Sequence, residues 1–526
     1  MSRIARAAGR ISAATLVSRV LGLLRDSIRA ALVGARGVSD ALGTAYLIPN
    51  LLRDLFAEGA FSGAFVPTLS KAREQTGDEG AFLLLNRVFS TLLIYVGSIV
   101  VLIAVFAPQL VSLLTSAAFR ADSELVGTTI LLVRLLAPFL LFISLAAAAM
   151  GALNVFGRYF LPALSPATQN AVLVLGGVVL LQLAMSETEA AIPWAGLLLA
   201  GGFMQFAVQV PALMREGWRP RFVPDARLRS PETRLILRRM LPVVGGMAAT
   251  HASILINWRL ATNFYGGPSN LYYAFRLVHL PVGLVGVAVG TAVLAEASRR
   301  VARNDFAGVR SALGESFLLT LVFAAPAAAG LFVLGEPIAR LLFMHGHLDA
   351  MDASAIGTTI LFYAPAVVFY ASVKVVAPIF FAQGRVHVPL IASLVAVAAN
   401  LATALTLHYL TDLRWLGLAF AVGVGQAANL AVLLWNARRL YGPPAASHLA
   451  SILKIALSAL ICALVARGVL GMLPRGDSLP DRLAAALVPV LAGALAYFAA
   501  GKVLRCREMA RALGASRGLD NPQDRP

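Results

Sequence analysis

The chain has 526 residues, of which 59% are hydrophobic and only 13% charged, and its mean hydropathy is +0.79. An average soluble domain is roughly 45–50% apolar and about 25% charged, so this composition excludes a water-soluble chain and predicts an integral membrane protein. The net charge of +18 does not indicate nucleic-acid binding, because Lys and Arg collect in the cytoplasmic loops of membrane proteins. The two cysteines, Cys462 and Cys506, form neither a disulfide framework nor a metal cluster.

Apolar runs separated by charged residues or by Pro and Gly predict fourteen transmembrane helices. No remaining stretch is long and polar enough to form a soluble domain, so the predicted fold is all-α. The predicted spans are 10–33, 41–69, 83–115, 125–155, 160–184, 191–213, 235–263, 270–297, 312–342, 354–382, 387–409, 414–436, 450–470 and 483–504.

Basic residues are distributed unequally between the two sides of these spans. With the N-terminus inside, 28 Lys and Arg fall in the inner segments and six in the outer ones. This asymmetry predicts a multi-pass membrane protein with both termini in the cytoplasm. The six outer residues are Arg36, Arg120, Arg414, Arg467, Arg475 and Arg482.

The chain contains a weak internal repeat. Ala137-Pro138 and Gly157-Arg158 recur 227 residues later as Ala364-Pro365 and Gly384-Arg385. Spans 4–6 therefore correspond to spans 10–12, which predicts two pseudo-symmetric six-helix lobes plus two C-terminal helices. Parallel repeats of this kind are typical of transporters that bind substrate between the lobes. The predicted regions are an N-lobe at 1–214, a basic cytoplasmic loop at 215–240, a C-lobe at 241–440, and spans 13 and 14 with a basic tail at 441–526.

Ten basic residues fall inside the predicted spans, where a central arginine costs at least ~2.5–3.5 kcal/mol. Four lie near span ends and are predicted to extend toward the lipid headgroups: Arg29, Arg259, Arg340 and Lys454. The position of Arg134 does not assign it clearly to either the span ends or the deep group. The deeper ones are Arg19, Arg25, Arg53, Arg276 and Lys374.

Two interpretations of the deep charges stay open. They form charge pairs that lock helices together, or they line a water-filled cationic cavity. On a helix, Arg19 and Asp26 share one face, so Asp26 can offset one arginine of the first span. Arginine presents a fixed fork of donors that suits paired phosphate oxygens, so the cavity interpretation predicts an anionic amphiphile as substrate.

The first two spans carry the most distinctive sequence. The motifs are Ser18-Arg19-Val-Leu-Gly22-Leu-Leu-Arg25-Asp26, Ser39-Asp40-Ala41, Ile48-Pro49-Asn50-Leu-Leu-Arg53, and Leu55-Phe56-Ala57-Glu58-Gly59-Ala60-Phe61-Ser62-Gly-Ala-Phe65-Val66-Pro67. Two further motifs are Leu271-Tyr272-Tyr273-Ala274-Phe275-Arg276-Leu277 and Lys374-Val375-Val376-Ala377-Pro378. With these motifs and its fourteen spans, the chain resembles the MviN/MurJ family, the lipid II flippases of bacterial peptidoglycan synthesis.

The resemblance implies the fold of the multidrug/oligosaccharidyl-lipid/polysaccharide (MOP) exporters and the translocation of lipid II between leaflets by alternating access. No bond is made or broken, so it implies a transporter with no catalytic residue and no cofactor. Arg19, Arg25, Arg53 and Arg276 would line the central cavity and meet the pyrophosphate. Supporting or gating roles would fall to Asp26, Asp40, Glu58, Ser18, Asn50 and Lys374.

The resemblance also implies that spans 13 and 14 form a hydrophobic groove for the undecaprenyl tail. The expected partners are lipid II, membrane phospholipids and other cell-wall synthesis proteins, with no nucleic acid.

Two positions depart from the family pattern. Phe275 stands where the family often has an acidic residue, so the charge partner of Arg276 is left open between Glu58 and the substrate. The spans that hold sodium in some members offer Asn257, Asn400 and Thr403 but no central carboxylate. We therefore predict no metal site, and coupling to membrane potential, H⁺ or Na⁺ stays open.

The charged residues distinguish the flippase function from three alternative functions. An exporter of another lipid-linked oligosaccharide or of drugs shares the fold, but the arginine set favours a pyrophosphate-bearing substrate. A membrane enzyme needs acidic metal-binding pairs or a nucleophile and base. The longest inner loop holds only Glu216, Asp225 and Glu232, set among arginines and prolines. A purely structural scaffold leaves the deep arginines unexplained.

Overall fold

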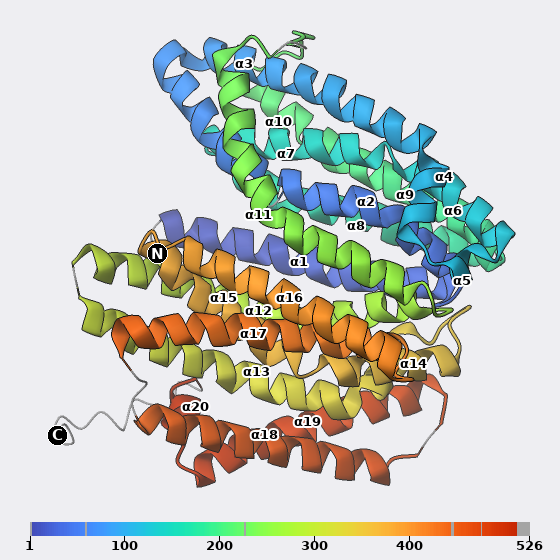
Figure 1. Ribbon diagram of the computed structural model, residues 1–526, viewed down its shortest axis with the longest axis vertical. Helices are drawn as coiled ribbons and strands as arrows, with labels where there is room; N and C mark the ends of the chain where they lie inside the picture. The colour runs from blue at the N-terminus through green and yellow to red at the C-terminus, as the bar shows by residue number, and fades with distance from the viewer. Residues whose placement is uncertain are drawn as a thin grey trace. The chain divides into compact units, whose positions relative to one another are not determined.

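The computed structural model describes residues 3–57, 60–225, 228–303, 305–442, 446–474 and 476–512. Within these ranges the chain forms twenty helices, α1 to α20, and no strand (Figure 1). It divides into two compact units. Unit 1 comprises Met1–Ser269 and His345–Asp349, and unit 2 comprises Asn270–Met344 and Ala350–Pro526.

Unit 1 holds the first eleven helices. They are α1 (Arg3–Val33), α2 (Val38–Ala57), α3 (Ala60–Val105), α4 (Ala107–Leu114), α5 (Ala117–Arg120), α6 (Ser123–Leu136), α7 (Phe139–Val155), α8 (Phe160–Gln182), α9 (Glu187–Ala207), α10 (Val210–Arg215) and α11 (Pro231–Ala261).

The next helix, α12 (Gly267–Ala302), begins in unit 1 and continues into unit 2. Unit 2 then contains α13 (Phe306–Phe343), α14 (Ala350–Tyr363), α15 (Ala366–Ala382), α16 (His387–Leu410), α17 (Trp415–Tyr441), α18 (Ala446–Met472), α19 (Leu479–Val503) and α20 (Arg507–Ala512).

The all-α membrane fold predicted from composition is confirmed. Ten helices of the described ranges are long and apolar enough to cross a membrane, or eleven if α14 and α15, bent by 48°, form one span. The predicted number of fourteen transmembrane spans stays a prediction. One reason why fewer helices qualify as spans is the charge within α2, which carries Asp40, Arg53 and Asp54.

The sequence repeat marks the same structural breaks in both units. Ala137-Pro138 separates α6 from α7, and Ala364-Pro365 separates α14 from α15. Gly157 and Gly384 end α7 and α15 with φ angles of +75° and +70°, which glycine adopts at little cost. In each turn the next arginine N–H donates to the carbonyl five residues earlier, at 2.8 Å and 2.9 Å. The repeated residues therefore encode repeated helix ends.

Contacts within unit 1 place α11 with α3 and α4, so this compact unit extends beyond the repeat boundary at 214 to Ser269. The Trp258 indole N–H donates to the Thr44 hydroxyl at 3.1 Å. The predicted boundaries follow the sequence repeat, whereas the compact units follow packing.

A close approach of α8 to α1 fixes the surroundings of the first-span charges. A Cβ added at Gly177 would lie 2.5 Å from Ile28 and 2.8 Å from Trp194, so glycine is required for this packing. Trp194 is 1% exposed and belongs to the core of unit 1. This approach brings Asn170 of α8 to the charged face of α1.

Candidate functional site

Arg25 and Asp26 form a buried ion pair on α1. The Arg25 Nη2 and Nε atoms donate to Asp26 Oδ1 at 2.7 Å and 2.9 Å. Their side chains are 14% and 2% exposed. Since a buried charge is costly unless it is paired and hydrogen-bonded, Asp26 stabilises the charged state of Arg25 in this position.

Asn170 holds the same guanidinium from the neighbouring helix α8. Its Oδ1 accepts from Arg25 Nη1 at 3.0 Å, and its Nδ2 donates to the Ser18 carbonyl at 3.0 Å. Asn170 is 8% exposed. The sequence analysis missed this residue, because the 145 positions that separate it from Arg25 leave no local signal.

Arg19 and Arg53, the other two deep arginines of unit 1, are half-buried. Across the part of unit 1 that is described, Arg19 makes no hydrogen bond or ion pair. Asn50 of α2 presents an amide oxygen that is buried without a hydrogen-bond partner in the described residues. Glu58, predicted to support this cluster, lies outside the described residues.

Arg29 corrects an expectation. It was predicted to extend toward the headgroups, but it is 5% exposed and donates to the Ser39 carbonyl at 3.1 Å. The reason is the neighbouring start of α2, which supplies a buried acceptor where a single-helix view assumes lipid. Arg340, from the same predicted group, is only partly exposed and pairs with Glu336 at 2.9 Å.

Asp40 connects the start of α2 to the start of α12. Its carboxylate accepts from the Gly266 N–H at 2.8 Å, the Ser269 N–H at 2.9 Å and the Ser269 hydroxyl at 2.6 Å. Asp40 is 2% exposed. The first turn of a helix has N–H groups without intrahelical partners and a positive dipole end, so the carboxylate stabilises this terminus.

In unit 2, Arg276 and Lys374 are both exposed. The Arg276 guanidinium lies 5.1 Å from the Tyr272 ring centre, and its Nη2 donates to the Tyr272 hydroxyl at 3.3 Å. The backbone carbonyl of Lys374 lies 2.5 Å from the position that a Cβ on Gly290 would take, so α12 and α15 are in close contact here. The rings of Phe275 and His279 are in contact, with centres 3.7 Å apart and planes inclined by 31°.

The predicted site residues are thus divided between the units. Arg19, Arg25 and Arg53 belong to unit 1, whereas Arg276 and Lys374 belong to unit 2. Asn257, considered for sodium, lies in unit 1, and Asn400 and Thr403 lie in unit 2. Over the described ranges, no cluster of three His, Cys, Asp or Glu residues could hold a metal ion.

Comparison with known sequences gives a consistent family. The sequence model described as "Lipid II flippase MurJ" matches residues 29–475. A Bdellovibrio bacteriovorus protein named "Probable lipid II flippase MurJ" is 31% identical over 97% of this chain and 96% of its own length. The Burkholderia cenocepacia "Lipid II flippase MurJ" is 30% identical over 82% of this chain and 84% of its own length.

Solved structures agree on the fold. The chain is similar to a lipid II flippase MurJ in an inward closed conformation, with a TM-score of 0.77 and 24% identity over 96% of this chain and 99% of the other. It is also similar to an inward-facing multidrug resistance transporter of the MATE family and MOP superfamily, with a TM-score of 0.65 and 16% identity over 80% and 94% of the two chains. With the family model matching most of its length, the chain belongs to the MurJ family of lipid II flippases.

Proposed function

We propose that this protein moves lipid II from the inner to the outer leaflet of the bacterial cytoplasmic membrane. The observation that carries the proposal is the family match over residues 29–475, supported by relatives named as lipid II flippases along almost the whole chain. Translocation changes no covalent bond, so the protein is a transporter and not a catalyst. Its many apolar helices suit a multi-pass protein of this membrane, with both termini in the cytoplasm.

The deep arginines would bind the substrate's pyrophosphate. Arg25 is the best prepared of them, because Asp26 and Asn170 hold its guanidinium in one orientation. Arg19, Arg53 and Arg276 would contribute further positive charge for binding, with Lys374 in support. Arginine pairs bidentately with phosphate oxygens, so a pre-oriented guanidinium loses little side-chain entropy on binding.

The three hydrogen bonds around Asp40 support a gating role for this residue. A transporter that works by alternating access must separate helix ends that are joined in another state. Asp40 joins the start of α2 to Gly266 and Ser269 at the start of α12. If these two helix ends separate, the Asp40 carboxylate loses all three hydrogen bonds and must accept from water or from other donors instead.

The tail of lipid II would lie along α18 and α19, whose outward surfaces carry exposed leucines such as Leu453, Leu464, Leu491 and Leu495. For the energy source we favour membrane potential or protons, because the sodium candidates Asn257, Asn400 and Thr403 include no carboxylate.

The test is complementation of a bacterium depleted of its own lipid II flippase, with membrane levels checked for every variant. Wild type should restore growth and outer-leaflet lipid II, and Arg19→Ala, Arg25→Ala, Arg53→Ala and Arg276→Ala should not. A well-expressed wild type that fails would identify another lipid-linked oligosaccharide as substrate. Full rescue by the alanine variants would assign these arginines to structure alone.

A further inference from the structure

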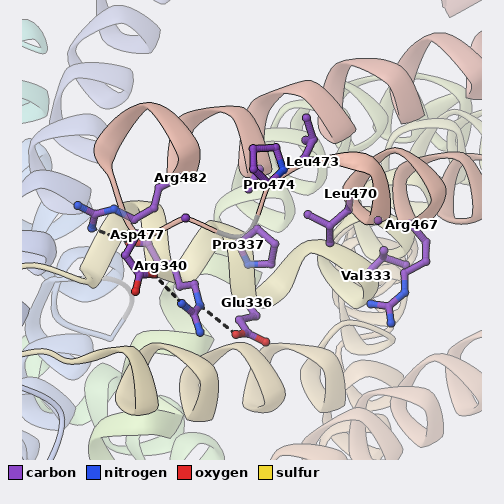
Figure 2. Close-up of a pocket in the computed structure, with 13 residues that line it drawn as sticks. Val333, Glu336, Pro337, Arg340, Arg467, Leu470, Leu473, Pro474, Asp477 and Arg482 are labelled. Atoms are coloured by element: carbon purple, nitrogen blue, oxygen red, sulfur yellow. Dashed lines mark hydrogen bonds and ion pairs between the residues drawn. The ribbon is translucent and has the colours of Figure 1, made fainter.

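A cavity of about 560 Å³ lies within unit 2, between α13, the end of α18 and the start of α19 (Figure 2). Its lining combines three arginines, two carboxylates and several apolar side chains. The charged residues are Glu336, Arg340, Arg467, Asp477 and Arg482. Two of these arginines, Arg467 and Arg482, are among the six basic residues predicted on the outer side, where the charge bias of membrane proteins disfavours them.

Both carboxylates are already paired with one arginine. Arg340 Nε donates to Glu336 Oε1 at 2.9 Å, and its Nη1 donates to Asp477 Oδ1 at 3.0 Å, as Figure 2 shows. Arg482 donates to the Met344 carbonyl beyond the last turn of α13, at the negative end of the helix dipole. The Arg482 Nε atom is buried and finds no hydrogen-bond acceptor among the described residues.

Arg467 is the remaining cation. It extends from α18 beside Val333 (Figure 2), is exposed, and makes no hydrogen bond or ion pair with the residues that the structure describes. Of the described lining, three arginines therefore face two carboxylates. One positive charge and one buried donor are left for an anion.

The rest of the lining is apolar and continues onto the helix surfaces. Val333, Pro337, Leu470 and Leu473 form the walls, and exposed leucines extend from them along α18 and α19. Arg467 lies five residues before the end of α18, which is about 7.5 Å along the helix axis. In the predicted topology this depth corresponds to the headgroup region of the outer leaflet.

We propose that this cavity binds the phosphodiester headgroup of an anionic phospholipid from the outer leaflet. Arg467 and the Arg482 Nε atom would contact the phosphate oxygens, and the acyl chains would lie on the apolar surface of α18 and α19. A headgroup with a single negative charge balances the single positive charge left among the described lining residues. Its phosphate-binding residues differ from the arginines proposed for the lipid II pyrophosphate, whereas its acyl chains would lie on the same α18 and α19 surface as the lipid II tail.

The test is native mass spectrometry of the purified full-length protein titrated with phosphatidylglycerol, phosphatidylethanolamine of the same acyl chains, and inorganic phosphate. We expect phosphatidylglycerol to bind about tenfold more tightly than phosphatidylethanolamine, and Arg467→Gln to lower its affinity by about tenfold. Arg507→Gln, at an exposed arginine of the same unit outside the cavity, is the matched control and should change nothing.

Equal binding of the two lipids, or an unchanged affinity in Arg467→Gln, would overturn the proposal. If inorganic phosphate displaces phosphatidylglycerol at equal concentration, the ligand of the cavity is a free anion and not a lipid. Arg482→Lys tests the second contact independently, because it keeps the charge and removes the buried Nε donor. It should weaken phosphatidylglycerol binding a few-fold, and no effect would exclude this atom from the site.

Discussion

Arg25 of α1 and Arg276 of α12 are both predicted to meet the same pyrophosphate, yet their surroundings differ. The Arg25 side chain is 14% exposed and bonded to a carboxylate on its own helix and to an amide on α8. Arg276 is exposed and lies over the ring of Tyr272, one turn away on its own helix. A buried ion pair makes Arg25 part of the fold as well as of the proposed site, whereas Arg276 can serve binding without supporting the core. Substitutions at the two positions should therefore separate stability from transport.

The largest effect is expected from Asp26→Ala. Removing one partner of a buried ion pair leaves an uncompensated charge and typically costs ~3–5 kcal/mol of unfolding free energy. Asp349→Ala is the matched control, because its ion pair with Arg36 is 57% and 35% exposed and should contribute at most about 1 kcal/mol. Thermal unfolding of both variants in the same detergent measures the difference. Equal losses would show that burial of the Arg25 pair has no energetic consequence.

Arg276→Gln should impair transport and leave stability unchanged. Loss of a charge-assisted contact to phosphate predicts a decrease of about 10–100-fold in lipid II translocation, with the free energy of unfolding unchanged within about 0.5 kcal/mol. Translocation into vesicles and thermal unfolding are measured on the same preparation.

The control for this substitution is Arg439→Gln, because Arg439 lies over Trp435 at 4.9 Å in a similar cation–π contact. It should retain full transport. A loss of stability in Arg276→Gln as large as that in Asp26→Ala would make Arg276 a structural residue and remove the contrast with Arg25.

Much of the fold could be predicted from apolar runs, because the cost of unpaired backbone groups in lipid leaves helices as the natural solution. The breaks at Ala137-Pro138 and Ala364-Pro365 were not predicted, because the spans 125–155 and 354–382 run across them. These dipeptides indicated only the repeat, although proline cannot continue a helix without losing a hydrogen bond. In the site, Asp26 was expected to offset one arginine of the first span, on the ground that it shares a helix face with Arg19. The structure pairs it with Arg25 instead.

Contacts between distant segments could not be predicted in the same way. Asn170 reaches Arg25 only because Gly177 lets α8 approach α1, and neither residue carries a recognisable motif. The Arg29 prediction was wrong for a related reason. Its position near a span end suggested lipid headgroups, but the acceptor at Ser39 lies on the next element.

Asn170→Ala sharpens the comparison, because it alters the orientation of Arg25 without removing any charge. The loss of two hydrogen bonds, one of them to a charged group, should cost about 1–3 kcal/mol of unfolding free energy. If Asn170 is a positioning residue, its effect on transport should largely disappear in an Arg25→Gln background. Additive effects on transport in this double-mutant cycle would assign Asn170 to packing alone.

The smallest effects are expected at the repeated turns, where the comparison between the units becomes a test of the duplication. Gly157→Ala and Gly384→Ala each place a side chain at a φ angle near +70°, which should cost about 1–2 kcal/mol. Neither added Cβ meets another atom within 4 Å, so backbone conformation alone accounts for the cost.

Gly196→Ala, in open space inside α9, is the control and should stabilise by up to about 1 kcal/mol because alanine favours helix. Equal losses at the two turns, measured by thermal unfolding, are expected if the repeated residues encode the same helix end twice. A loss at only one turn would show that the sequence repeat does not carry an energetic equivalence.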